Sequence, residues 1–244
     1  METGERVVRK VTAALEHDPR VEFHNHPIQV MFDPAGALVL EGELPNIAAK
    51  KLALEHAAAA SGLSGVIDRL RITPTRSMSD GEIREHVRDA LLQESAIAHY
   101  GLRLFDDARE EAHRESTAAP RCSIDVAVND GVVTLDGQVT SLSHKRLVGA
   151  LAWWAPGVRD VINGIEVSPE QEDSDAEITE AVKLVLEKDP LVNAERIRVV
   201  THDATVTLEG LTPSAADREL AEMDAWYVFG VDQVINRIEY QRQR

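Results

Sequence analysis

The tripeptide Leu135-Asp136-Gly137 ends a stretch of alternating apolar residues, and close copies of it stand at Leu40-Glu41-Gly42 and Leu208-Glu209-Gly210. Alternation of apolar residues is typical of a half-buried strand, and each copy is followed by a stretch with helical spacing. A supersecondary unit that repeats along a chain sets the architecture of the whole. The sequence therefore predicts three small domains in tandem rather than one large globule.

Two further elements flank each copy. An amphipathic helix precedes it, because apolar residues recur at i, i+4 and i+8. The three rows are Val7, Val11 and Leu15; Ile83, Val87 and Leu91; and Ile178, Val182 and Leu186. Asn46, Ser141 and Ser214 stand four residues after the repeated glycines and suit the N-cap of a second helix. A last strand follows each second helix.

Each unit thus reads helix, strand, strand, helix, strand, which predicts an α+β fold with two helices on one face of a mixed three-stranded sheet. We expect the domains at residues 1–75, 78–169 and 174–244. The middle domain carries additional residues at about 98–120, including Tyr100 and Phe105, which we interpret as an extra helical excursion. Insertions often carry function, so this one is a candidate partner or homo-oligomer contact; a lid over the core or a strut between domains is the plainer alternative.

Composition excludes several classes of function. The formal net charge of −16 disfavours binding to nucleic acid, which attracts basic surfaces. The single cysteine, Cys122, cannot form an intramolecular disulfide. The sequence shows no export signal and no apolar run long enough to span a membrane, so we expect a cytoplasmic protein, or a periplasmic one if a signal was removed.

The repeated segments resemble the BON domain, a bacterial module of osmotic-shock and nodulation proteins. The resemblance rests on residues 133–139 (Val-Thr-Leu-Asp-Gly-Gln-Val), on 155–163 (Ala-Pro-Gly-Val-Arg-Asp-Val-Ile-Asn), and on 206–210 with 230–231 and 234–236 in the third copy. It implies a non-catalytic module that attaches to phospholipid surfaces in envelope or stress proteins, with some relatives that bind small ligands or ions.

Asn163 and Asn236 end the Val-Ile-Asn step of the second and third copies, and the first copy, at 65–70, reads as lacking that step. A role in ligand contact would make both asparagines binding residues. The plainer alternative is that they serve the backbone of a turn or strand edge.

Paired aromatic residues end two of the second helices, as Trp153-Trp154 and Trp226-Tyr227. Helical spacing places Trp154 and Tyr227 on the core face and leaves Trp153 and Trp226 partly exposed. An exposed indole suits a membrane interface or a partner groove. The alternative is that both tryptophans cover gaps between neighbouring domains.

No catalytic motif is present, and His24 with His26 lacks the further ligands that a metal site needs. His144 lies among charged residues on a helix and is expected at the surface. We therefore expect no enzyme activity, no metal and no cofactor. The leading hypothesis is a binding or scaffolding protein associated with a membrane or an envelope component. A ligand or ion sensor with an interdomain site, and a homo-oligomeric structural protein, are the alternatives.

Overall fold

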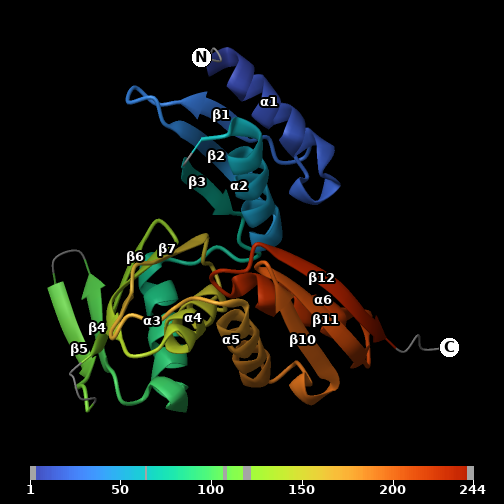
Figure 1. Ribbon diagram of the computed structural model, residues 1–244. Helices are drawn as coiled ribbons and strands as arrows, with labels where there is room; N and C mark the ends of the chain where they lie inside the picture. Colours follow the sequence, from blue (N-terminus) through green and yellow to red (C-terminus); the bar gives the residue numbers. More distant parts are fainter. Residues whose placement is uncertain (1–3, 64, 107–108, 118–121, 241–244) are drawn as a thin grey trace. The chain divides into compact units, whose positions relative to one another are not determined.

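The computed structural model describes residues 4–63, 65–106, 109–117 and 122–240, and the fold is α+β with mixed sheets. The chain divides into two compact units, residues 1–73 and 74–244, coloured blue to teal and green to red in Figure 1. The first unit holds domain 1 and the second holds domains 2 and 3. We describe each unit by itself.

Domain 1 places two helices against a three-stranded sheet of order β1-β2-β3. Strand β1 is antiparallel to β2, and β3 is parallel to it. The buried residues of the first helix are Val7, Val11 and Leu15, as its spacing predicts. The elements are α1 (Gly4–His17), the 3-10 turn η1 (Pro19–Val21), β1 (Gln29–Phe32), β2 (Leu38–Leu44), α2 (Ile47–Ser61) and β3 (Val66–Ile72).

Domain 2 repeats the elements of domain 1, with β4 and β5 inserted before its hairpin, and has a wider sheet, β5-β4-β6-β7-β8, with the short strand β9 also paired to β7. Its first helix buries Ile83, Val87 and Leu91, which confirms the predicted row. The elements are α3 (Asp80–Gln93), the 3-10 turn η2 (Ser95–Ile97), β4 (Gly101–Asp106), β5 (Arg109–Arg114), β6 (Ser123–Asn129), β7 (Val132–Val139), α4 (Leu142–Trp153), β8 (Asp160–Asn163) and β9 (Glu166–Val167).

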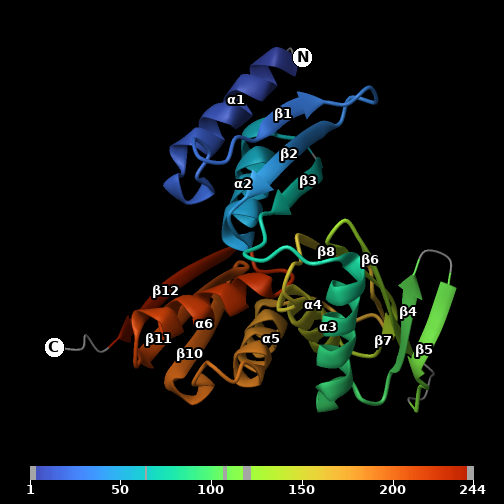
Figure 2. The ribbon, with the colours of Figure 1, turned by 180° about the vertical axis from the view of Figure 1, so that it is seen from behind.

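Domain 3 returns to the plain three-stranded sheet, of order β10-β11-β12. Figure 2 shows α6 lying over these strands. The predicted row of its first helix is again buried, at Ile178, Val182 and Leu186. The elements are α5 (Asp175–Lys188), the 3-10 turn η3 (Ala194–Arg196), β10 (Ile197–His202), β11 (Thr205–Thr212), α6 (Ala215–Tyr227) and β12 (Gln233–Tyr240).

The insertion in domain 2 is a β-hairpin, so the expectation of a helical excursion is wrong. Strand β4 runs parallel to β6, and β5 returns antiparallel to β4 at the outer edge of the sheet (Figure 1). Leu102 and Leu104 alternate with Arg103 and Phe105 along β4, and this period of two is that of a strand. The hairpin therefore extends the sheet of domain 2 beyond the strand that ends it in the other two domains.

The hairpin turns of domains 2 and 3 are held from the first helix of the same domain. Asp80 accepts hydrogen bonds from the backbone N–H groups of Asp130 (2.9 Å) and Gly131 (2.8 Å). Asp175 accepts from Asp203 (2.8 Å) and Ala204 (3.0 Å) in the same way. All four turn residues have positive φ, which two-residue hairpin turns of this kind require. One carboxylate thus ties each hairpin to the start of its helix.

The repeated tripeptides lie in the same register in all three sheets. Leu40 faces Asp68, Leu135 faces Asn163 and Leu208 faces Asn236 in the parallel pair that closes each domain. Val66-Ile67-Asp68 is therefore the first copy's version of the Val-Ile-Asn step. The first copy has lost the asparagine, as expected, and an aspartate stands at the same register position.

Candidate functional site

Domains 2 and 3 meet through helix α4, which packs on α5 and α6 of the following domain as well as on its own sheet. Seven consecutive residues, 146–152, are buried. A helix that is buried all round needs neighbours on every side. Gly149, Ala150 and Ala152 lie within this run, and their small side chains let the neighbouring elements approach closely. The two domains therefore share one packed core.

Arg146 is the polar centre of this junction and is 0% exposed. Its Nε donates to the carbonyl oxygen of Phe229 at 2.8 Å. One terminal nitrogen donates to both carboxylate oxygens of Asp173, at 2.6 and 2.8 Å. The other, Nη1, is buried and has no hydrogen-bond partner among the described residues. A guanidinium from domain 2 is thus held by the linker and by the loop after α6, which makes the arrangement of domains 2 and 3 specific.

An aromatic surface lies beside this arginine, and we call it the junction patch: Lys145, Trp153, Tyr227 and Phe229. The rings of Trp153 and Tyr227 are stacked, with their centroids 5.8 Å apart and their planes at 18°. The Nζ of Lys145 lies 5.4 Å from the ring centroid of Phe229. Phe229 is 54% exposed, and the other three side chains are half-buried. The patch thus consists of two pairs, one of stacked rings and one of a cation with a ring, each formed between α4 and the end of α6 or the loop after it.

A buried carboxyl group lies under the same helices. The indole Nε1 of Trp154 donates to Oδ1 of Asp224 at 2.9 Å, while Oδ2 is buried without a partner among the described residues. Burial, and then the charge of Asp189, raise the pKa of Asp224 to about 8. Asp224 is therefore protonated at neutral pH. Burial and Asp224 likewise raise the pKa of the Tyr227 hydroxyl to about 12.

Trp153 and Trp226 were expected to be partly exposed, and the structure agrees for only one of them. Trp153 is half-buried, as predicted. Trp226 is 2% exposed and lies in the core, so that expectation is wrong for Trp226. Trp154 and Tyr227 are half-buried rather than in the core. The physical reason is that α4 and α6 contact each other across the junction as well as their own sheets, so each helix buries more than one stripe.

Asn163 and Asn236 join the closing strand to the second helix of their domains. The Nδ2 of Asn163 donates to the carbonyl oxygen of Lys145 at 2.9 Å, and its Oδ1 accepts from the N–H of Ile165 at 3.3 Å. Asn236 makes the same two bonds, to Arg218 and Ile238, at 3.0 Å each. These contacts favour the backbone role over the ligand role.

Domain 1 replaces the asparagine bridge with an ion pair. Asp68 accepts from the N–H of Leu70 at 2.8 Å and pairs with Nζ of the buried Lys50 at 2.9 Å. Lys50 occupies the place on α2 that Lys145 and Arg218 hold in the other second helices, four residues after the N-cap. The same strand-to-helix bridge is therefore built with different chemistry.

Tyr100 and Phe105, the candidates in the insertion, lie in different environments. Tyr100 is 0% exposed, and its hydroxyl contacts Thr140 Oγ1 at 2.8 Å and His144 Nδ1 at 2.7 Å. Burial, and then the charge of His99, lower the pKa of His144, which is half-buried rather than at the surface as expected. Phe105 is half-buried on β4. Tyr100 therefore anchors the insertion internally and does not face a partner.

Two searches of the described ranges found nothing. There, no three His, Cys, Asp or Glu side chains gather as a metal site would require. None of the described helices is long and apolar enough to cross a bilayer. Sequence reasoning missed Arg146, Asp224 and Phe229. The one signal for Arg146 was its place directly before the uncharged stretch 147–152.

Comparison with known families accounts for the repetition. The family described as BON domain matches three segments, residues 4–74, 111–169 and 174–242. The chain belongs to the BON domain family. The second BON match begins inside the hairpin, so α3 and β4 lie outside it and the insertion interrupts this copy of the repeat. Three BON segments fit the three tandem domains of the structure.

Two BON-containing bacterial proteins are similar in sequence. The 21 kDa hemolysin of Actinobacillus pleuropneumoniae is 32% identical over 171 residues, which are 68% of this chain and 81% of that protein. Osmotically-inducible protein Y of Escherichia coli is 31% identical over 122 residues, 48% of this chain and 61% of that protein. A solved structure of CdsD, a type III secretion protein of Chlamydia trachomatis, aligns over 99% of this chain and 100% of that one, at 11% identity and a TM-score of 0.25, which carries no argument about function.

Proposed function

We propose that this three-domain BON protein is a non-catalytic scaffold of bacterial stress and envelope physiology that attaches to a phospholipid surface through the junction patch. The observation that carries the proposal is Phe229, an aromatic side chain that is 54% exposed on a packed support beside Lys145. An aromatic ring next to a cation suits the boundary between lipid headgroups and acyl chains. The BON family and the osmotically inducible relative support the physiological setting.

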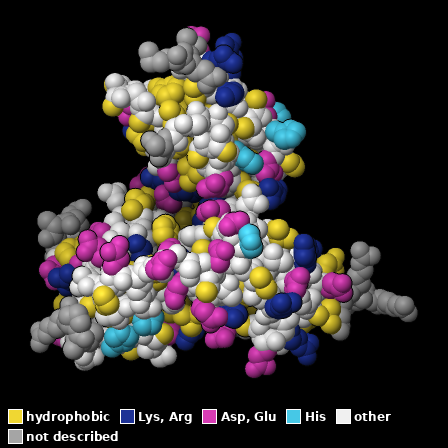
Figure 3. All heavy atoms as spheres, in the orientation of Figure 1, with side chains coloured by type: hydrophobic (Ala, Val, Ile, Leu, Met, Phe, Trp, Pro, Cys, Tyr) yellow, Lys and Arg dark blue, Asp and Glu magenta, His cyan; other side chains and the backbone are white. Residues whose placement is uncertain are grey.

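Charge alone would not bring this protein to an anionic membrane. The net charge is −16, and on the face shown in Figure 3 the Lys and Arg side chains are scattered among Asp and Glu rather than gathered in one basic area. A polybasic segment contributes about 1 kcal/mol for each Lys or Arg near an anionic leaflet, which an acidic surface forgoes. The proposed attachment therefore depends on apolar insertion at the junction patch.

Vesicle co-sedimentation of the full chain tests this proposal. We expect binding to phosphatidylcholine vesicles at least as strong as to phosphatidylglycerol vesicles, and a roughly three- to tenfold loss of affinity in Phe229→Ser, because the ring supplies the buried apolar area. Leu191→Ser is the matched control, since Leu191 is 67% exposed and lies outside the junction patch. Absence of binding to both vesicle types, or unchanged binding by Phe229→Ser, would refute attachment by this patch.

The homo-oligomer and sensor alternatives, the domain boundaries and the cytoplasmic location stay predictions. One observation bears on the oligomer. Strand β5, at the outer edge of the insertion, carries the exposed Glu110 and Glu111. Charges on an edge strand discourage pairing with another chain. An oligomer contact through the insertion would therefore have to use a surface other than this edge.

A further inference from the structure

The two domains of the second unit differ at one edge of their sheets. In domain 2, β6 is flanked by β4, which lies parallel along it. In domain 3, β10 occupies the place of β6 but is the terminal strand, and no described segment pairs with its outer side. An unpaired edge presents backbone N–H and C=O groups that another strand can bind.

Strand register establishes which residues of the two edges correspond. Ile124 and Val126 of β6 face Gly137 and Leu135 of the repeated tripeptide. Ile197 and Val199 of β10 face Gly210 and Leu208. Ile197 therefore corresponds to Ile124, and Val199 to Val126. The residues between them, Arg198 and Asp125, correspond as well.

Strand β4 shows what fills this edge in domain 2. Leu102 pairs with Ile124 and Leu104 with Val126, and these leucines are 0% and 2% exposed. Both turn toward the face that the helices cover, because alternate residues of a strand share a face. The extended segment thus adds a strand to the sheet and two apolar side chains to the core.

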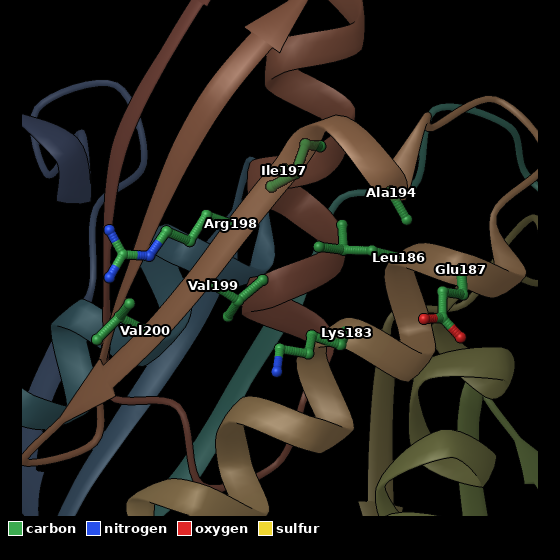
Figure 4. A pocket seen from close by; sticks show the side chains of 8 residues that line it. All are labelled: Lys183, Leu186, Glu187, Ala194, Ile197, Arg198, Val199 and Val200. Atoms are coloured by element: carbon green, nitrogen blue, oxygen red, sulfur yellow. The ribbon is translucent and has the colours of Figure 1, made fainter.

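Domain 3 has an open groove at the corresponding place. Its volume is about 390 Å³, and it lies between α5 and β10. Apolar residues, among them Leu186, Ile197 and Val199, line it together with the charged Lys183, Glu187 and Arg198. Figure 4 shows Leu186 and Val199 turned toward the gap between helix and strand, with Arg198 on the other side of the strand. The groove is therefore located where the two leucines of β4 would lie if domain 3 had such a strand.

The charge beside the groove indicates that a segment bound there would differ from β4 at one residue. In domain 2, Arg103 of β4 donates its Nε to Oδ1 of Asp125 at 2.7 Å on the outer face of the sheet. In domain 3, the corresponding position holds Arg198, whose side chain is 75% exposed and whose Nη1 donates to Oε2 of Glu209 at 3.4 Å. The charge at this position is negative in domain 2 and positive in domain 3. A strand like β4 would therefore place its arginine beside Arg198, whereas an acidic residue there would be attracted to Arg198.

We propose that the groove between α5 and β10 binds an extended segment of a partner protein, which lies parallel to β10 and carries an acidic residue between two leucine-like residues. The apolar residues would occupy the groove beside Ile197 and Val199, and the acid would face Arg198. The proposal goes beyond membrane attachment and does not depend on it, since none of these residues belongs to the junction patch.

Peptide titration of the full chain tests the proposal. The two probes are labelled peptides that carry residues 101–106, one unchanged and one with Arg103→Glu, between identical Gly-Ser flanks. By fluorescence anisotropy we expect the Arg103→Glu peptide to bind about tenfold more tightly, because one cross-strand pair changes from repulsive to attractive. The Arg198→Glu protein is expected to reverse this preference.

Two control variants separate the groove from general charge effects. Arg237→Glu makes the same charge change beside the same Glu209, from which Arg237 lies 3.6 Å, but on the strand β12 at the opposite edge, so it should leave the preference unchanged. Ala194→Phe places a ring at the groove and should abolish binding of both peptides. Thermal melting of each variant checks that it is folded.

Three results would overturn the proposal. The first is no binding of either peptide at about 1 mM, the weakest affinity that such a contact would have to reach. The second is that the wild-type and Arg198→Glu proteins show the same ratio of affinities for the two peptides. The third is self-association, detected by light scattering and abolished by Ala194→Phe, which would identify a second copy of this chain as the occupant instead.

Discussion

Asp224 is a single carboxyl group that the fold holds away from water, under the indole of Trp154. Its pKa of about 8 in the folded protein lies far above the value of an exposed aspartate. The folded state therefore binds a proton that the unfolded state has already lost at neutral pH. The contribution of Asp224 to stability is complete below about pH 4 and is lost as the pH rises toward 8.

We predict that Asp224→Asn removes this pH dependence. An amide can still accept the hydrogen bond from Trp154 and carries no charge at any pH. The free energy of unfolding of the wild type should fall, relative to Asp224→Asn, by about 1.4 kcal/mol for each pH unit between about pH 4 and 8. Urea denaturation at several pH values measures the difference. Asp232→Asn, at an exposed position of the same domain, should track the wild type, and a parallel course of Asp224→Asn and wild type would contradict the prediction.

The closing strand of each domain also depends on one residue. Asp68, Asn163 and Asn236 each accept from the N–H two residues ahead and reach back to the second helix. This position requires a side chain that accepts a hydrogen bond from the backbone N–H two residues ahead and that also binds the second helix. Asparagine supplies both functions alone, and aspartate supplies them when a buried lysine provides the donor.

At the scale of elements, helix α4 is the one that two domains share. Arg146 lies at its centre, and its hydrogen bonds to Phe229 and Asp173 join residues 83 and 27 positions away along the chain. Removal of a buried, hydrogen-bonded charge leaves a cavity and an unsatisfied carbonyl group. The junction should therefore be sensitive to this side chain.

We predict that Arg146→Ala lowers the free energy of unfolding of the second unit by about 3 kcal/mol, the lower end of the range for a broken buried pair, because Asp173 is itself partly exposed. Urea denaturation followed by tryptophan fluorescence measures this change. Arg198→Ala removes an exposed arginine of the same unit and should change stability by less than about 0.5 kcal/mol. Equal effects of the two substitutions would show that the junction contributes little.

Some helices and strands could be predicted from the sequence better than others. The rows of α1, α3 and α5 were predicted correctly because these helices bury one stripe, and a single stripe is visible as periodicity. Trp226 was misplaced because α6 packs on two sides, and a second buried face comes only from another domain. The strands of the insertion were missed because the spacing of Leu102 and Leu104 is short and lies among charged residues, where the repeat offers no template.

The candidate site was less predictable than the fold for the same reason. Trp153 was identified from helical spacing, but its contact with Tyr227 joins two domains whose arrangement no local pattern encodes. Arg146 and Asp224 look like surface residues in the sequence, and burial alone gives them their roles. Phe229 lies just after a helix end and belongs to neither of the aromatic pairs that the sequence shows, so nothing in the sequence marked it.

At the scale of the molecule, the chain consists of two compact units of unequal size, residues 1–73 and 74–244. Because domains 2 and 3 pack on each other around α4, we expect them to unfold together, whereas domain 1 has its own core. All three tryptophans, Trp153, Trp154 and Trp226, lie in the second unit. Fluorescence therefore reports on that unit alone.

We predict that far-ultraviolet circular dichroism shows two unfolding transitions in urea and that tryptophan fluorescence shows only one of them. Two-state behaviour fails when independent units unfold at different denaturant concentrations. The fluorescence midpoint should move in Arg146→Ala, while the other dichroism transition stays in place. A single transition that coincides in both signals would mean that the whole chain unfolds together.

The hydrogen bond from Arg146 to Phe229 has a consequence during synthesis. A ribosome that adds about 5–20 residues each second needs several seconds to extend the chain by the 83 positions from Arg146 to Phe229. Throughout that interval the nascent middle domain has its guanidinium but not the carbonyl group that receives it. During this stage of synthesis, the side of α4 that packs on domain 3 has no partner. We expect a chaperone that binds the nascent chain to act mainly at this stage.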